Sequence, residues 1–140
     1  ALSNFILLPF VRELYGLKIG SILSLAGRFF ALGTVVTAVG IAAVWAVMHY
    51  GYKLPVSDAL LWYGYGYVVQ IYLGLPLIYG LYKVGRESLV LRVNIAVVVL
   101  NFAGNLALIP VMGLEGALLS SFVVQSAASL TYLFAVVRLR

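Results

Sequence analysis

Three asparagines on one face of an apolar segment are the polar side chains whose spacing most clearly indicates a site. Asn94, Asn101 and Asn105 fall within about 40° of one another when successive residues are placed about 100° apart, as in an α-helix. An amide that faces lipid leaves its donors and acceptors unsatisfied at a cost of several kcal/mol, so this face must contact other helices or water. Two interpretations stay open: hydrogen bonds between helices, or one wall of a hydrophilic cavity.

A second polar face is expected in the apolar segment that follows. Ser121, Gln125, Ser129 and Tyr132 lie within about 80° of each other on a helix. Small hydroxyl residues commonly pack between membrane helices. Packing is therefore the favoured interpretation of this face, and Gln125 is also a candidate for lining a cavity.

The segment from residue 59 to 82 adds aromatic and amide side chains. Tyr67 and Gln70 share one side of the expected helix, and their polar groups are able to line a cavity that accommodates sugars. Packing and interfacial anchoring are the default interpretation for most of the tyrosines in this segment. Pro76 is expected to kink the helix, which makes it a candidate hinge, although many such kinks are only structural.

The sequence contains no recognisable catalytic set or metal site. Cysteine is absent, which excludes disulfides, thiolate metal ligands and thiol catalysis. His49 is the single histidine, and no carboxylate accompanies it at a catalytic or metal-ligand spacing. No acidic residue lies in the middle of an apolar segment, so an acidic proton or sodium relay is not encoded here. We therefore expect no enzymatic activity, no bound metal and no cofactor.

Four long apolar segments carry these side chains. Each is long enough for a helix, which rises about 1.5 Å per residue, to cross a hydrocarbon core roughly 30 Å thick. A soluble domain of this length could not bury a chain that is 64% hydrophobic and 9% charged. The segments are Phe29–Tyr50, Ala59–Tyr82, Val93–Met112 and Ala117–Val137.

The sequence thus predicts an all-α membrane protein. Residues 26–140 are expected to form a bundle of four transmembrane helices. Residues 1–25 are expected to hold the end of a preceding membrane helix and an amphipathic cytoplasmic linker.

The basic residues are distributed unequally between the two sides of these segments. Of the nine Lys and Arg residues, all except Lys53 lie before the first segment, between the second and third, or after the fourth. The positive-inside rule places that side, and both ends of the chain, in the cytoplasm of a multi-pass protein of the cell membrane. The net charge of +5 is explained by this pattern, so nucleic acid is not an expected partner.

One stretch resembles a known family. The residues from Asn101 to Ala117 read NFAGNLALIPVMGLEGA. They resemble the signature of polysaccharide flippases of the multidrug/oligosaccharidyl-lipid/polysaccharide exporter superfamily, in which an asparagine-bearing span ends in Leu-Ile-Pro and Gly-x-x-Gly-Ala opens the next. Pro110 is expected to close one helix, Gly113 to allow a tight turn, and Gly116 to let the returning helix pack closely.

The resemblance covers nearly all 140 residues and implies the C-terminal part of a larger, two-lobed transporter. Such a transporter would open a central cavity alternately to each side and move undecaprenyl-diphosphate-linked oligosaccharide to the outer leaflet for surface polysaccharide synthesis. Its expected partners are membrane lipid, this lipid-linked oligosaccharide and an N-terminal lobe of the same transporter. The resemblance implies that polar and aromatic side chains would meet the sugars: Asn94, Asn101, Asn105, Gln70, Gln125 and Tyr67.

Two arginines near the ends of apolar segments are the candidates for contacting the diphosphate. Arg28 lies at the start of the first segment, and lipid anchoring is the favoured interpretation of its role. Arg92 precedes the third segment and lies opposite the asparagine face on the helix wheel, which weakens its case.

Other functions stay open. A multidrug or metabolite cation antiporter, or a lipid II flippase, of the same superfamily would share this fold. From a different class, the chain is also compatible with a non-transporting membrane scaffold or a small subunit of a synthesis complex. In a scaffold the asparagine and glutamine faces would be sealed against neighbouring helices, with no path for water.

Overall fold

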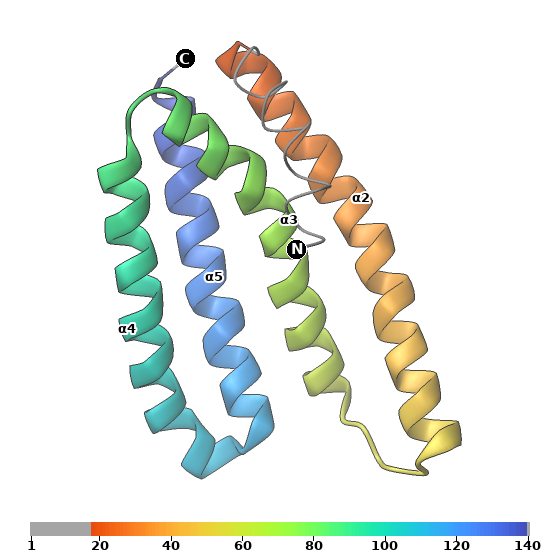
Figure 1. The fold of residues 1–140 in the computed structure, drawn as a ribbon. Coiled ribbons are helices and arrows are strands. Elements are labelled where there is room, and N and C mark those ends of the chain that lie inside the picture. The colour runs from red at the N-terminus through yellow and green to blue at the C-terminus, as the bar shows by residue number, and fades with distance from the viewer. Residues whose placement is uncertain (1–17, 140) are drawn as a thin grey trace, which may run out of the picture.

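The computed structural model describes residues 18–139, and within them the chain folds into long α-helices with no strand (Figure 1). The expected all-α class is confirmed. The elements are α2 (Ile19–Ala46), which continues into the π-helical turn η1 (Val47–Gly51), α3 (Asp58–Lys83), α4 (Glu87–Met112) and α5 (Leu114–Val137).

Local signals in the sequence explain where the later helices begin and end. The Ser57 hydroxyl accepts a hydrogen bond from the Leu60 N–H at 3.2 Å and so caps α3. Gly85 has φ +70° in the turn between α3 and α4, and Gly113 has φ +59° between α4 and α5. These left-handed conformations are accessible to glycine without strain, which allows both helical hairpins to turn sharply.

The first described helix begins earlier than the sequence predicts. The start was expected at Phe29, with a linker up to residue 25, but α2 already begins at Ile19. Ile22 and Ala26 are buried against the other helices, and this packing extends the helix through a segment that contains Gly20. The preceding helix end and the rest of the expected linker fall in residues 1–17, outside the described part of the chain.

Three helices are long and apolar enough to cross a membrane. They are α2 together with η1, α4 and α5, which indicates a multi-pass membrane protein. The fourth expected span, α3, has 26 residues like α4 but is not among these three helices. Its tyrosines and Gln70 make it less apolar than its neighbours.

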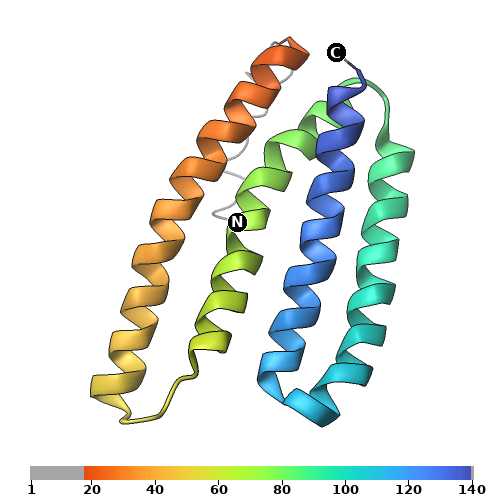
Figure 2. The same cartoon turned by 180° about the vertical axis from the view of Figure 1, so that it is seen from behind.

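The helices lie side by side in the order α2, α3, α5, α4 (Figures 1 and 2). The outer pairs α2–α3 and α5–α4 are antiparallel, whereas the central pair α3 and α5 runs parallel, from the loop between α2 and α3 and the turn at Gly113 toward the opposite end (Figure 1). The start of α2, the α3–α4 turn and the end of α5 share one end of the molecule (Figure 1). We call this the basic end, because it holds Lys18, Lys83, Arg86 and Arg138. We call the other the loop end, because it holds the segment 52–57 and the turn at Gly113.

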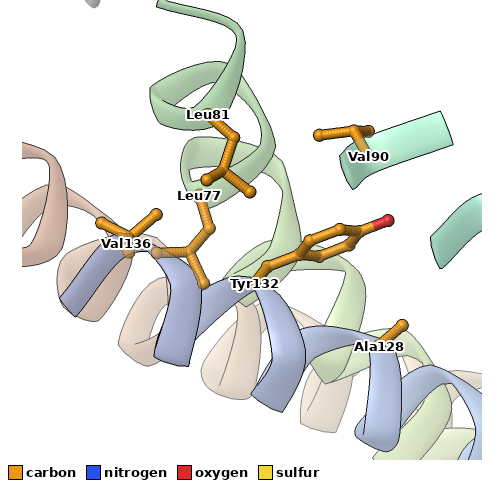
Figure 3. Packing of buried hydrophobic residues seen from close by; sticks show 7 residues of the cluster. Leu77, Leu81, Val90, Ala128, Tyr132 and Val136 are labelled. Atoms are coloured by element: carbon orange, nitrogen blue, oxygen red, sulfur yellow. The ribbon is translucent and has the colours of Figure 1, made fainter. Parts of the chain in front are cut away.

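The hydrophobic core lies toward the basic end, where all four helices contribute to it. Leu77 and Leu81 of α3 and Val90 of α4 are fully buried against Tyr132 and Val136 of α5 (Figure 3). Ala26 of α2 and Ala128 of α5 complete the cluster. Tight packing holds membrane helices together where the surrounding lipid is as apolar as the side chains, so the helices are joined firmly at this end.

Small residues let α2 approach α3 closely. Gly33 is buried, and a Cβ atom added there would fall within the side chain of Tyr72. Thr37, one turn later, is buried as well, whereas a Cβ at Gly40 would meet open space. Gly33 and Thr37 therefore form a seam of small residues between α2 and α3, which ends before Gly40.

Candidate functional site

The asparagine face of α4 lies against α5. The Tyr132 hydroxyl donates a 2.8 Å hydrogen bond to Oδ1 of Asn94, and the Ser121 hydroxyl donates one of 3.3 Å to Oδ1 of Asn101. The Ser120 hydroxyl lies 3.5 Å from the Asn101 carbonyl oxygen, to which it donates. Two of the three asparagines thus use their side chains between helices, which is the first of the two interpretations that the sequence left open.

Asn105 differs from the other two asparagines. Its Oδ1 is buried and accepts no hydrogen bond from the described residues. Its side chain also lines a recess of about 310 Å³ on α4, together with Phe102, Leu106, Ile109 and Pro110. A buried acceptor without a partner is costly and uncommon, so Asn105 is the member of this face whose amide oxygen is not used within residues 18–139.

Gln70 and Gln125 lie at the interface between α3 and α5. The Ser129 hydroxyl donates a 3.3 Å hydrogen bond to the Gln70 carbonyl oxygen. A Cβ added at Gly74 would lie 4.0 Å from Nε2 of Gln125, so this amide faces the small residue on α3. Gln70, Gln125 and Tyr67 are all half-buried, which places them in or beside a packed interface and not on an open wall.

The remaining candidates do not join these residues in one site. Arg28 is exposed on α2 and lines a shallow recess with Ser21, Ser24 and Leu25. Arg92 is exposed on α4. Pro76 is buried inside α3, whose ribbon bends between its two halves in both views (Figures 1 and 2). A kink is therefore present, and its use as a hinge stays a proposal.

The largest cavity that we describe was not predicted from the sequence. It occupies about 530 Å³ between α2 and α3 in the half of the molecule nearer the loop end. Trp45 of α2 and Trp62 and Tyr65 of α3 supply aromatic walls, and Asp58 supplies a carboxylate. We call this space the α2–α3 cleft. Ala38, Ile41, Ala42 and Leu61 form the rest of its lining.

Ring contacts and backbone contacts hold the walls of the α2–α3 cleft. The Trp45 ring stacks on His49 with centroids 5.0 Å apart, and the rings of Trp62 and Tyr65 meet edge to face at 6.1 Å. The Tyr65 hydroxyl donates to the Thr34 carbonyl oxygen at 3.5 Å, which links α3 to α2. The only sign of this cleft in the sequence was the aromatic residues in the segments that form α2 and α3. Interfacial anchoring explains such residues equally well, so they did not predict a cleft.

The start of α3, where Asp58 lies, is tied to the start of α5. The Ser57 hydroxyl donates a hydrogen bond to Oε1 of Glu115 while it caps α3. Asp58 follows in the first turn, where the positive end of the helix dipole favours a carboxylate. This hydrogen bond joins the starts of α3 and α5 next to Asp58.

The side chains that line the α2–α3 cleft offer groups for binding. Within residues 18–139, no three His, Cys, Asp or Glu side chains come together in a way that would hold a metal ion. The α2–α3 cleft combines apolar walls, aromatic rings and one carboxylate, which suits the binding of an amphipathic molecule. Neither a family model, a curated protein nor a solved structure matches this chain.

Proposed function

We propose that this chain is the C-terminal part of an alternating-access transporter in the cell membrane. Its cargo would be undecaprenyl-diphosphate-linked oligosaccharide, moved to the outer leaflet for surface polysaccharide synthesis. The observation that carries the proposal is the contrast between the two ends: a packed core toward the basic end and the α2–α3 cleft nearer the loop end. A helical unit that is closed at one end and hollowed at the other is what alternating access requires of each state.

The membrane arrangement belongs to the same proposal. In it, α3 crosses the bilayer with the other three helices, since it lies between α2 and α5 and has the length of α4. The basic end would face the cytoplasm, following the positive-inside rule. The α2–α3 cleft would then open toward the outer side, where a flippase must release its cargo.

The chemistry of the cleft fits the sugar part of such a cargo. Pyranose rings present C–H faces that pack on aromatic rings, which Trp45, Trp62 and Tyr65 supply. Their hydroxyls need acceptors, which Asp58 supplies here. In this proposal an N-terminal lobe of the same transporter completes the cavity. Asn105, Arg28 and Arg92 lie outside the α2–α3 cleft, so they would contact the cargo, and the two arginines its diphosphate, only in the cavity that both lobes form.

The helical hairpin formed by α4 and α5 adds support from the stretch that resembles the flippases. A Cβ at Gly116 would lie 2.5 Å from the Leu108 carbonyl oxygen, so the returning helix packs directly on the backbone of α4. Gly113 provides the turn with its positive φ. Pro110, which was expected to close α4, lies inside the helix instead, and α4 continues to Met112. Proline at this position removes only one backbone donor near the helix end, which is why the helix is able to continue.

A scaffold without transport activity is the second candidate. The hydrogen bonds of Asn94 and Asn101 across α4 and α5 favour it, because they occupy side chains that were expected to line a cavity. In that case the α2–α3 cleft would be filled by another helix and not by cargo.

Cysteine labelling in the full-length protein would separate the two candidates. Leu61→Cys and Ala38→Cys place thiols in the α2–α3 cleft, and Val90→Cys, which is fully buried, is the matched control. A transporter predicts that a membrane-impermeant thiol reagent labels the two cleft positions from outside, and that Trp62→Ala reduces polymer export. Absence of labelling in every state, with unchanged export for Trp62→Ala at normal expression, would contradict the proposal.

Asp58 distinguishes the flippase from the cation antiporter of the same superfamily. Asp58→Asn keeps a hydrogen-bond acceptor for a sugar hydroxyl but removes the charge that would attract an organic cation. A flippase predicts that much of the export activity is retained. Complete loss of transport with normal expression would favour a cationic substrate.

A further inference from the structure

A pocket at the basic end brings together two arginines from different elements. Arg86 lies in the turn between α3 and α4, and Arg138 is the C-cap of α5. Both line a pocket of about 310 Å³, and Leu81, which is fully buried, forms part of its floor. Leu89 and Ala135 extend the apolar wall. Two cationic groups therefore stand at the edge of an apolar recess.

The two guanidinium groups are available to a ligand. Within residues 18–139, neither Arg86 nor Arg138 forms an ion pair. The Arg138 guanidinium carbon lies 4.1 Å from the centroid of the Phe134 ring, and this contact holds it beside the pocket that Phe134 also lines. Guanidinium groups bind phosphate oxygens through paired hydrogen bonds, so the chemistry that fits this pair is a phosphate ester.

An exposed apolar stripe on α5 leads to the same pocket. Val123, Ala127, Leu130 and Phe134 are exposed and recur every three or four residues, so they follow one face of the helix. Arg138 continues the series at its basic end. A molecule with an acyl chain and an anionic headgroup would cover this stripe and reach the arginines at once, whereas a soluble phosphate would leave the stripe unused.

We propose that this pocket binds the headgroup of an anionic phospholipid, with an acyl chain lying along the exposed stripe of α5. Basic pockets between membrane helices on the cytoplasmic side are suited to anionic lipid headgroups. The pocket is separate from Arg28 and Arg92, neither of which lines it. The inference rests on the proposed orientation of the basic end toward the cytoplasm but not on the cargo, so loss of lipid binding and loss of transport are distinguishable outcomes.

Native mass spectrometry of the purified chain in detergent, titrated with phosphatidylglycerol, tests the site. We expect Arg86→Gln and Arg138→Gln each to weaken binding about fivefold, and the double variant about 25-fold, as the loss of one and two surface cations predicts. Lys18→Gln removes a charge from the same end without touching the pocket and should leave the affinity unchanged. Phosphatidylcholine should bind more weakly and be unaffected by these substitutions.

Arg86→Lys and Arg138→Lys keep the positive charge. They test whether weaker binding in the glutamine variants comes from the lost charge and not from misfolding. They should fall between the wild type and the glutamine variants, because lysine lacks the paired donors of arginine. Glycerol phosphate, which has the anion but no acyl chain, should compete poorly. Wild-type affinity in the double glutamine variant would overturn the proposal, and binding of glycerol phosphate as tight as that of the lipid would assign the pocket to a free phosphate.

Discussion

The hydroxyl of Tyr132 on α5 donates a 2.8 Å hydrogen bond to Oδ1 of Asn94 on α4. Tyr132 is only 1% exposed, and its ring points from α5 toward α4 beside Val90 in the core (Figure 3). The first polar residue of the asparagine face is therefore joined directly to the hydrophobic core. This contact fixes the register of α4 on α5 at the basic end, because the partners are specific and not merely apolar.

Tyr132→Phe should destabilise the folded protein by removing this hydrogen bond while keeping the ring in the core. Interhelical hydrogen bonds in membranes contribute about 0.6 kcal/mol on average and up to about 1.7 kcal/mol, and the buried position of Tyr132 favours the upper part of that range. Unfolding in detergent by increasing mole fractions of sodium dodecyl sulfate, followed by far-UV circular dichroism, measures the change.

A double-mutant cycle with Asn94→Ala isolates the pair. The two substitutions should be less than additive, since each removes the same hydrogen bond. Tyr63→Phe, at a half-buried tyrosine of α3, is the control for loss of a hydroxyl alone. Full additivity of Tyr132→Phe and Asn94→Ala would show that the contact contributes nothing to stability.

Gly33→Ala should be costly, whereas Gly40→Ala on the same helix should not. A Cβ at position 33 would overlap Cβ and Cγ of Tyr72, which rotation of the side chain moves little. A Cβ at position 40 would face open space. Overpacking of this kind costs about 1–3 kcal/mol, and exposed helical substitutions stay within about 0.5 kcal/mol. The same unfolding measurement compares them, and Gly33→Ala combined with Tyr72→Ala should recover part of the loss. Equal stability of the two alanine variants would mean that α2 does not approach α3 as described.

The helices could be predicted from the sequence because long apolar runs and turn-forming glycines specify them locally. The start of α2 could not be predicted, because a charged residue such as Arg28 ordinarily lies at the edge of an apolar span. Arg28 instead lies inside α2, where a long side chain reaches solvent from the helix surface without ending the helix. Burial of Ile22 and Ala26, which depends on the other helices, decides the true start.

The candidate site was predictable only in part. Helical periodicity identified the face shared by Asn94 and Asn101, but not that Tyr132 and Ser121 would use these amides. Which face of α4 packs on which face of α5 depends on how the two helices dock. The periodicity of a single helix carries no information about that docking. The α2–α3 cleft was missed for the same reason, because Trp45 and Trp62 come together only after α2 and α3 pack.

Gly116→Ala should open the hairpin of α4 and α5 more than Gly104→Ala does. A Cβ at position 116 would lie 2.5 Å from the backbone oxygen of Leu108, and backbone in a helix has no room to move. A Cβ at position 104 meets the Ser120 hydroxyl, which is able to rotate away. We expect a loss of roughly 2 kcal/mol or more for Gly116→Ala and less for Gly104→Ala, measured by detergent unfolding. A larger loss for Gly104→Ala would contradict this packing.

The membrane crossing of α3 is open to a direct measurement of sidedness. Tyr52→Cys and Ser88→Cys place exposed thiols before and after α3, in a chain that contains no other cysteine. If α3 crosses the bilayer, a membrane-impermeant reagent added outside intact cells should label position 52 and leave position 88 unlabelled until the cells are opened. If α3 instead lies on the membrane surface, both positions would be labelled from the same side. The 26 residues of α3, the same number as in α4, favour the first outcome, because its tyrosines are largely half-buried between α2 and α5 and so are shielded from the hydrocarbon.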